Sequence, residues 1–449
     1  MKRDTQPDKS VASADRAVAA ALRRDRPLRA FLLAFSKAVS EAGGAAFLAG
    51  GYLRDVAEGS PGGDVDLMVA GLSHKELGKA LASLPSASLG IRKVVPAGKH
   101  FPVYRVATAW RGYVDVSTAR GGGPARRWDP LAQALDDASR RDFTFNSMLY
   151  ALSTRGRRLV GELFDPFGGV LDLERRTIRC VGDAQARLRE DPLRALRAIR
   201  MKNERKGYGI APPTLGAVKR LGPLLLPGIP ADRLVGELLR SLSANPTGTL
   251  EELRRSGILR ALLPELSRRR GAVSRAARRY RSMARSAGSP LPSEILLANL
   301  LVDLPPRDAE AAARRLRFPD VRKVLGILSG LRALRRPGTL RYPMAGTEAI
   351  LSRQETPAPF LALYRAAMAC DGRRGKNLKR YIIYCLKTPF LLDGSDLMEM
   401  GFPEGPGRQE ALLAVREATL AGRVRTREEA LKLAERLQAL TRRRLRQEG

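Results

Sequence analysis

The feature that most restricts the fold is a change in the hydrophobic pattern near Arg175. Before this point, short apolar runs alternate with stretches of helical spacing, and we expect the runs to be strands. They are Ala45–Ala49, Val65–Val69, Val103–Ala107 and Tyr113–Thr118. After this point, apolar residues recur at three- and four-residue intervals, as in Leu234, Leu238 and Leu242. The pattern predicts an α+β head followed by a long all-helical arm.

The charge of the chain calls for a polyanionic partner. Its 449 residues include 80 Lys and Arg against 46 Asp and Glu, a formal net charge of +34. Nucleic acid is the first candidate partner, an anionic membrane surface the second, and an arginine-rich composition spread over every surface is the alternative. The distribution favours phosphate-contacting patches, because eight arginines and no acid lie between Leu266 and Pro290 and four more lie within Arg442–Arg446.

Several classes of protein are excluded. The chain has no run of 18 apolar residues that would span a membrane, and its start lacks the apolar core of a secretory signal. Its three cysteines, Cys180, Cys370 and Cys385, form no Cys-x-x-Cys pair. We therefore expect a cytoplasmic, reduced protein with no membrane association. Because there are only two histidines, any chemistry must depend on carboxylates and arginines.

The first candidate site begins where the run Ala45–Ala49 ends in Gly50 and Gly51. Two glycines after a strand let the backbone approach a ligand and can present N–H groups to phosphate, although such turns are common. Asp64 and Asp66 flank Val65 at the start of the next run, so their side chains share one face. Paired carboxylates repel each other unless a cation lies between them, and Mg²⁺ prefers such oxygen ligands.

Two further patterns could complete this site. Asp115 alternates with apolar residues in Tyr113–Ser117, so it either faces solvent or adds a third carboxylate to the metal site. The second pattern is a helical ridge of arginines with an aspartate one turn before it: Asp191, Arg194, Arg197 and Arg200. A ridge of this kind either recognises a triphosphate and base edges or forms an exposed salt-bridged face.

Taken in order, these motifs resemble those of the class II tRNA nucleotidyltransferase and bacterial poly(A) polymerase family. The shared motifs are Gly-Gly-x-x-Arg-Asp, Asp-x-Asp, Arg-Arg-Asp-Phe-Thr-x-Asn, Asp-Pro-Phe-Gly-Gly and Glu-Asp-Pro-x-Arg-x-x-Arg, and they cover about half of the chain. The resemblance implies a polymerase-β-like nucleotidyltransferase head followed by an all-helical neck, body and tail. It also implies four segments: a basic polar leader (1–27), a catalytic head (28–170), a neck that recognises the base (171–245), and an RNA-binding body and tail (246–449).

The resemblance also implies roles for single residues. Asp64 and Asp66 match the ligands of two Mg²⁺ ions, and Asp115 stands where members often carry an acid. Gly51, which follows Gly50, and Arg54 match positions that contact the triphosphate. Arg141 matches an arginine near the nucleotide.

The remaining matched positions lie in the ridge of arginines. Asp191 and Arg194 match a pair that reads the incoming base, with Arg197 and Arg200 completing the site. Aspartate accepts a hydrogen bond from the exocyclic amine of cytosine or adenine, and arginine donates one to the ring. Guanine and uracil would leave buried groups unpaired at a cost of about 1–3 kcal/mol each.

The implied reaction is addition of CMP and AMP from CTP and ATP to the 3′ end of tRNA by two-metal phosphoryl transfer. The segments 392–407 and 425–430 resemble the tRNA-specific members, and 98–101 lacks the doubled arginine of the poly(A) branch, whereas the basic terminus resembles that branch. Poly(A) synthesis, partial CC or A addition, and a non-catalytic RNA-binding role stay open as alternatives. Glu58 departs from the family pattern, which commonly has leucines after Arg-Asp.

Overall fold

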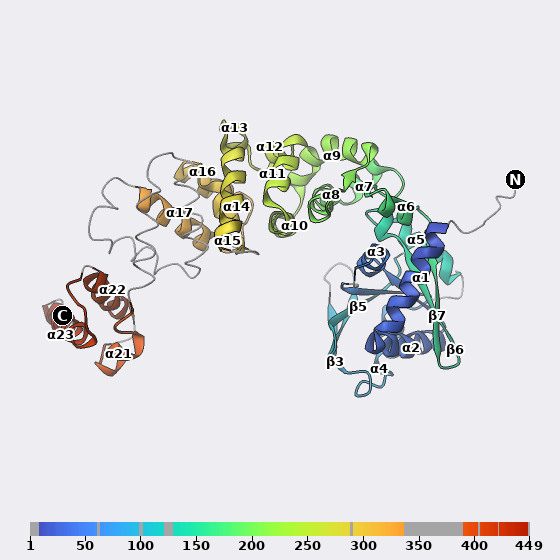
Figure 1. Cartoon of the computed structure of the whole chain (residues 1–449), viewed down its shortest axis with the longest axis horizontal. Coiled ribbons are helices and arrows are strands. Elements are labelled where there is room, and N and C mark those ends of the chain that lie inside the picture. Colours follow the sequence, from blue (N-terminus) through green and yellow to red (C-terminus); the bar gives the residue numbers. More distant parts are fainter. Residues whose placement is uncertain are drawn as a thin grey trace. The chain divides into compact units, whose positions relative to one another are not determined.

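The structure is a computed structural model that describes residues 9–60, 63–97, 102–120, 129–287, 291–335, 389–402, 405–420 and 422–447. The chain divides into two compact units, Met1–Leu225 and Leu226–Gly449, which are described separately (Figure 1). No helix in the described ranges has the length and apolar character that a membrane span requires.

A seven-stranded mixed sheet forms the centre of the first unit, with strand order β3-β4-β5-β2-β1-β6-β7. The strands are β1 (Ala45–Ala49), β2 (Val65–Ala70), β3 (Ile91–Ala97), β4 (Val103–Thr108), β5 (Gly112–Thr118), β6 (Leu149–Arg155) and β7 (Arg158–Phe164). Only β2 and β5 pair in parallel; every other neighbouring pair is antiparallel. The middle of the sheet is therefore β2, which has β1 on one side and β5 on the other.

Helices cover the sheet. On the face that includes Phe47 and Met68, α5 (Pro130–Ser139) contributes Ala134 and Ala138 to a buried apolar cluster. The helix α2 (Arg26–Glu41) buries Leu28, Phe31, Leu32 and Phe35, the spacing of one helical face. It begins at Asp25, whose side chain accepts a hydrogen bond from the Leu28 amide at 3.0 Å.

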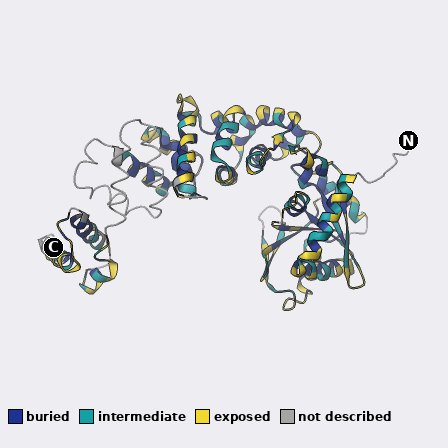
Figure 2. Ribbon diagram, in the orientation of Figure 1, coloured by how far each residue is buried: buried dark blue, intermediate teal, exposed yellow. Residues whose placement is uncertain are grey.

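The segment that the sequence suggests as a leader includes a helix of the head. This helix, α1 (Lys9–Arg24), buries Ala14, Val18 and Leu22, and the Asp15 carboxylate accepts a hydrogen bond from the Leu163 amide of β7 at 2.9 Å. Figure 2 colours most of α1 as intermediate or buried. The helix packs because its small and aliphatic residues recur at four-residue spacing among the charges.

The remaining elements of the first unit complete the head and lead into a helical neck. They are α3 (Gly51–Ala57), α4 (His74–Ala82), η1 (Thr144–Asn146), α6 (Gly169–Glu174), β8 (Thr177–Ile178), α7 (Ala184–Glu190), α8 (Leu193–Glu204), β9 (Gly209–Ile210) and α9 (Pro212–Leu225). Asp165 of the Asp-Pro-Phe-Gly-Gly motif caps α6 through the amides of Gly169 and Val170, at 2.6 and 2.8 Å. Pro192 lies just before α8. At this place the backbone N–H that proline lacks would have no hydrogen-bond partner within the helix.

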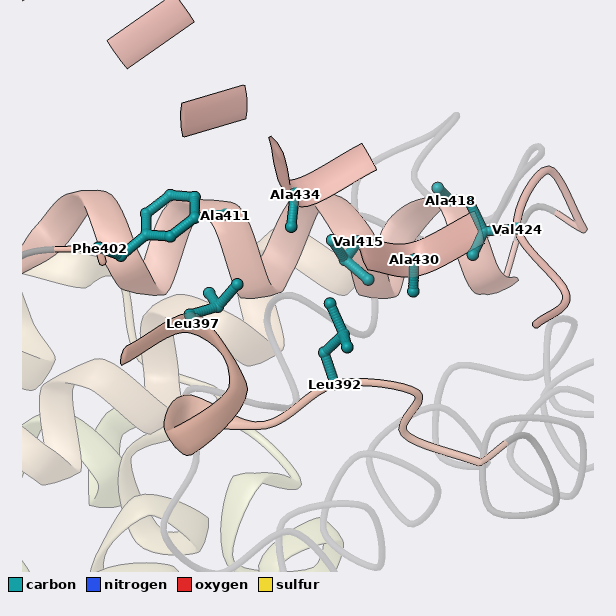
Figure 3. Packing of buried hydrophobic residues seen from close by; sticks show 9 residues of the cluster. All are labelled: Leu392, Leu397, Phe402, Ala411, Val415, Ala418, Val424, Ala430 and Ala434. Carbon is teal, nitrogen blue, oxygen red and sulfur yellow. The ribbon is translucent and has the colours of Figure 1, made fainter. Parts of the chain in front are cut away.

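The second unit is helical throughout its described residues. It comprises η2 (Leu226–Gly228), α10 (Ala231–Ala244), α11 (Pro246–Arg255), α12 (Ile258–Leu262), α13 (Pro264–Arg268), α14 (Ala272–Ala287), α15 (Ser293–Leu301), α16 (Pro306–Arg315), α17 (Val321–Arg335), α21 (Gly394–Glu399), α22 (Pro406–Leu420) and α23 (Arg427–Gln447). The last three helices enclose an apolar cluster centred on Leu397, Phe402 and Val415 (Figure 3).

The α+β head followed by helices is confirmed, although three strands of the seven-stranded sheet and the short pair β8 and β9 were not predicted from the sequence. The strand β3 lies at the sheet edge, and its exposed Arg92, Lys93 and Pro96 hide the apolar pattern that marks a buried strand. The hairpin β6–β7 joins an apolar strand to a mostly half-exposed one, so its two strands share no simple period.

A buried arginine connects α14 to α15 in the second unit. The Arg279 side chain has no exposed surface and donates to the Asn299 carbonyl and to an Asp303 carboxylate oxygen, each at 3.0 Å. We expect Arg279→Met to lower the free energy of unfolding by about 3–5 kcal/mol, because the substitution removes the buried donor to both Asn299 oxygens and one of the two arginines that contact Asp303. Urea unfolding of the full chain measures this loss.

The matched control is Arg275→Met. Arg275 also contacts Asp303, at 3.2 Å, but its side chain is partly exposed, so about 1 kcal/mol or less is expected. Equal effects of the two substitutions would contradict a special role for Arg279.

Candidate active site

Two carboxylates lie side by side at the centre of the sheet. In the observed register Asp66 of β2 is opposite Ala49 of β1 and opposite Asp115 of β5. Residues paired in this way point to the same face. Asp64 precedes β2 by one residue, two positions before Asp66, and the structure thus gathers the three acids that the sequence suggests.

The electrostatics of Asp66 reflect this crowding. The pKa of the Asp66 carboxyl is raised to about 6, mainly through desolvation by the surrounding protein and to a smaller extent through the negative charges of Asp115 and Asp64. The positive charges of Arg141 and Arg54 act in the opposite direction. The nearby arginines therefore do not offset the combined effect of desolvation and the neighbouring carboxylates.

The Gly-Gly turn lies directly against Asp66. Gly50 has φ +75°, and a Cβ at this position would lie 3.0 Å from an Asp66 carboxylate oxygen and 3.6 Å from Arg141 Nη1. Glycine meets both requirements, because it adopts positive φ without strain and adds no atom to the site. Gly51 then begins α3, which brings Arg54 to the same region.

Arg54 is held in place by polar contacts on both sides. Its Nη1 donates to Asn146 Oδ1 at 2.9 Å, and its Nε donates to Asp55 at 3.0 Å. Asn146 in turn donates to Asp142 at 3.0 Å. Arg141 is fixed separately, by Asp137 at 3.2 Å and by the Asn146 carbonyl at 3.2 Å. Both arginines therefore have a defined orientation near Asp66.

The four residues of the arginine ridge have different surroundings. Arg197 lies 3.6 Å from Asp142 and 3.9 Å from Asp191, so it connects the ridge to the head. Arg194 is buried, and its guanidinium donates to the Arg187 carbonyl at 2.8 Å and to the Arg140 carbonyl. Its buried Nε has no hydrogen-bond partner among the described residues.

Arg200 lies further along α8. It pairs with Glu204 at 2.9 Å on the next turn. The structure thus groups Asp191, Arg194 and Arg197 at the start of the helix, and it does not bring Arg200 to Asp191 through any of these contacts.

Asp115 already has a cationic partner. Arg105 of β4, directly opposite in the sheet, donates to both Asp115 oxygens at 2.8 and 2.9 Å. In the described residues no three His, Cys, Asp or Glu side chains lie close enough together to hold a metal ion. Carboxylate oxygens suited to Mg²⁺ are nevertheless present in Asp64 and Asp66, and neither forms an ion pair within the described part of the chain.

Glu58, the departure from the family pattern, connects α3 to the neck. Its carboxylate accepts a hydrogen bond from the Tyr208 hydroxyl and pairs with Arg205, which also contacts Asp55 at 2.8 Å. Leu53 and Val56 still pack inside the head, so the charged residue changes the outer face of α3 and leaves its core face intact.

Four residues near the site were not singled out by sequence reasoning. They are Arg105, Asp137, Asp142 and Asn146. The last two belong to the Arg-Arg-Asp-Phe-Thr-x-Asn motif, so their motif membership was a usable signal. Arg105 was detectable only once the β4–β5 register was known. The segment 98–101 lies outside the described residues, as do the side chains of Arg442–Arg446.

Comparison with known protein families agrees with this architecture. Residues 46–179 match the family described as Poly A polymerase head domain, and residues 207–269 match the one described as Probable RNA and SrmB-binding site of polymerase A. The Multifunctional CCA protein of Xanthomonas campestris pv. campestris strain B100 is 36% identical over 239 residues. That alignment covers 51% of this chain and 53% of the relative, so the chain spans about half the length of the curated relatives it matches.

Solved structures match over more of the chain. The Bacillus stearothermophilus CCA-adding enzyme in complex with CTP is 26% identical, with a TM-score of 0.61 over 92% of this chain and 98% of that one. The Thermotoga maritima CCA-adding enzyme complexed with tRNA_CCA is 20% identical, with a TM-score of 0.66 over 94% and 98%. The polymerase-β-like head with its helical continuation and the resemblance drawn from the motifs are both confirmed.

The crowding of carboxylates leads to a pH-dependent prediction. Since the folded state raises the pKa of Asp66 from 3.8 to about 6, ionised Asp66 destabilises the fold above pH 6. Without metal, Asp66→Asn should therefore increase the free energy of unfolding at pH 7.5 by roughly 1 kcal/mol, a value that allows for solvent screening. This gain corresponds to a rise of about 2–4 °C in the melting temperature. Most of this gain should be lost by pH 4.5, where the wild-type carboxyl takes up a proton.

Scanning calorimetry at the two pH values measures the difference. Asp136→Asn is the control, because Asp136 is exposed and pairs with Arg140 at 2.9 Å. An Asp66→Asn protein that melts at or below the wild-type temperature at pH 7.5 would contradict the electrostatic account.

Proposed function

Because residues 46–179 belong to the Poly A polymerase head-domain family, we propose that this chain is a template-independent RNA nucleotidyltransferase that adds CMP and AMP to the 3′ end of tRNA. The observation that carries the proposal is the alignment of Asp66 with Asp115 beside the Gly50 turn. This arrangement offers carboxylates for metal ions, backbone and arginine donors for phosphates, and a connected helix for the base.

The donor set fits magnesium. Asp64 and Asp66 are the residues that would hold two Mg²⁺ ions, with Asp115 as a further catalytic carboxylate in the same row. Bound Mg²⁺ would activate the RNA 3′-hydroxyl and stabilise the charge on the transferred phosphate and the leaving pyrophosphate. The raised pKa of Asp66 supports this assignment, because a bound cation would offset both the desolvation and the smaller repulsion that raise it.

Nucleotide phosphates would lie along the start of α3. Gly50 and Gly51 allow the backbone to come close to them, and Arg54 supplies a guanidinium whose direction is fixed by Asn146. Arg141 is the second such donor, held by Asp137. Preorganised arginines of this kind stabilise charge that develops during transfer without having to reorient.

Selection of CTP and ATP is assigned to the start of α8. Asp191 would accept from the exocyclic amine of the base, and Arg194 would donate to the neighbouring ring acceptor. The orientation of Arg194 is fixed by hydrogen bonds to Glu190 and to the Arg187 and Arg140 carbonyls. Arg197, between Asp191 and Asp142, would keep the pair aligned with the head, and Arg200 would support the same helix.

The remaining segments would serve RNA binding. We keep the division into a leader (1–27), whose helix α1 packs on the head, a catalytic head (28–170), a base-recognising neck (171–245) and an RNA-binding body and tail (246–449). The match of residues 207–269 to an RNA-binding family and the basic surface of α14 support an RNA partner. The proposed RNA substrate supports a cytoplasmic location.

Nucleotide incorporation on four RNAs tests this function. The substrates are a tRNA lacking CCA, a tRNA ending in CC, a complete tRNA and an unstructured oligonucleotide, each with CTP, ATP or both and Mg²⁺. Extension that stops after CCA on tRNA is expected. Stopping after CC, or starting only from CC, would indicate a partial-addition enzyme, and long A tails on the oligonucleotide would indicate a poly(A) polymerase.

Variants separate catalysis from RNA binding. Asp64→Ala should reduce incorporation at least 1,000-fold, on the order of 4 kcal/mol, because a metal ligand is lost while RNA affinity is kept. Asp136→Asn serves as the control and should retain activity. Full activity of Asp64→Ala would overturn the catalytic assignment and favour an RNA-binding protein without catalysis.

A basic face on α14 leads to a prediction for RNA binding. Arg278, Arg281 and Arg285 are exposed and recur at one-turn spacing on this helix. If each neutralises one phosphate, replacing all three by glutamine should lower the slope of log K against log salt by roughly 2–3. Fluorescence anisotropy with labelled tRNA between low and moderate salt measures the slope.

The control pair is Arg254→Gln with Arg255→Gln. Both guanidiniums already pair with Glu251 at 2.9 Å, so removing them should change the slope much less. A slope unchanged by the triple substitution on α14 would exclude this face from the RNA contact.

A further inference from the structure

Arg105 makes one of the most regular ion pairs of the head. Its Nε and Nη2 donate to the two oxygens of Asp115 at 2.8 and 2.9 Å, the parallel two-bond geometry that arginine forms with carboxylates. The residues are direct cross-strand neighbours on β4 and β5. Side-chain exposure is 49% for Arg105 and 33% for Asp115, so water reaches both partners.

This ion pair lies in the same row of the sheet as Asp66, one of the two carboxylates that would hold the metal ions. Across the sheet, Arg105, Asp115 and Asp66 lie at one level on three adjacent strands. The charge of Asp64 also acts on the Arg105 guanidinium. Among the described residues, Asp115 is the member of the carboxylate group that forms an ion pair within 4.0 Å, whereas Asp64 and Asp66 form none.

A divalent cation that reaches Asp115 must compete with this guanidinium. Arg105 and the metal ion are both positive, so the ion weakens the pair by repulsion and takes over the same oxygens. A half-exposed ion pair contributes only about 0–1 kcal/mol, so the exchange is reversible. An arginine keeps its charge at every physiological pH, and its competition with the metal does not depend on its own titration.

We propose that Arg105 is a displaceable counter-ion of Asp115, which competes with the divalent metal and thereby sets the metal concentration at which the site is filled. The proposal rests on the proposed function, because it requires Asp115 to serve as a metal ligand. Arg105 is a positioning residue in this scheme: it acts on the metal through Asp115.

The experiment measures metal binding by the full-length protein without nucleotide or RNA. Mn²⁺ is titrated into metal-free protein, and the free ion is followed by its electron paramagnetic resonance signal. Arg105→Gln should bind Mn²⁺ about 3–10-fold more tightly than the wild type. The control Arg92→Gln removes an exposed positive charge from the neighbouring strand β3 and should change the affinity less than 2-fold.

A double-mutant cycle separates competition from a general effect of charge. Asp115→Asn alone should weaken Mn²⁺ binding, and Arg105→Gln should bring no further gain once Asp115 is absent. The proposal is overturned if Asp115→Asn binds Mn²⁺ like the wild type, if Arg105→Gln does not tighten binding, or if it tightens binding equally in the Asp115→Asn protein. Melting curves of all four proteins verify that each is folded.

Failure of this proposal differs from failure of the proposed function. If only the counter-ion role is wrong, the wild type still incorporates nucleotides and binds Mn²⁺, while the cycle shows no coupling. If the function is wrong, the wild type incorporates no nucleotide on any of the four RNAs, whatever the metal affinities of the variants.

Discussion

The register of β2 between its two neighbours is the constraint on which the site depends. Antiparallel pairing with β1 places Asp66 beside the strand end that leads into Gly50, and parallel pairing with β5 places it beside Asp115. A slip of one residue would turn Asp66 to the opposite face and bring Val65 or Leu67 into its place. Burial of Met68 and Phe47 on the same face makes such a slip costly, so the apolar core fixes the geometry of the polar site.

Polar contacts extend this constraint from the sheet to the neck. Arg54 contacts Asn146, Asn146 contacts Asp142, and Asp142 contacts Arg197 beside Asp191. At the other end of α8, Arg205 and Tyr208 contact Asp55 and Glu58. The helix assigned to the base is thus attached to the head at both ends. Since these contacts are only partly buried, they set position and orientation more than they add stability.

Much of the fold and of the candidate site was predictable from the sequence, and each feature that was not predicted has a physical reason. The strands β1, β2, β4 and β5 were predicted because they are apolar or alternate cleanly. The pairing of Asp64 with Asp66 followed from their two-residue spacing, whereas spacing alone left Asp115 open between solvent and the metal site. The edge strand β3 was not predicted, because its exposed charges mask the period. The packing of α1 was missed since three buried residues among many charges give a weak signal. The Arg105–Asp115 pair depends on the register of two strands, which no local pattern fixes.

The acidic and basic residues of the head partly offset one another's charges. Carboxylates that lie near one another on one face of the central strands oppose folding, and the chain offsets them in two ways. Asp115 takes Arg105 as a direct partner, whereas Asp66 has Arg141 and Arg54 nearby, both oriented by other residues. The offset at Asp66 is incomplete, and its pKa stays near 6. Active sites commonly retain such uncompensated charge, because the interaction that would remove it belongs to the ligand. A site with every charge paired internally would be more stable, but it would have less free energy to gain from a divalent cation.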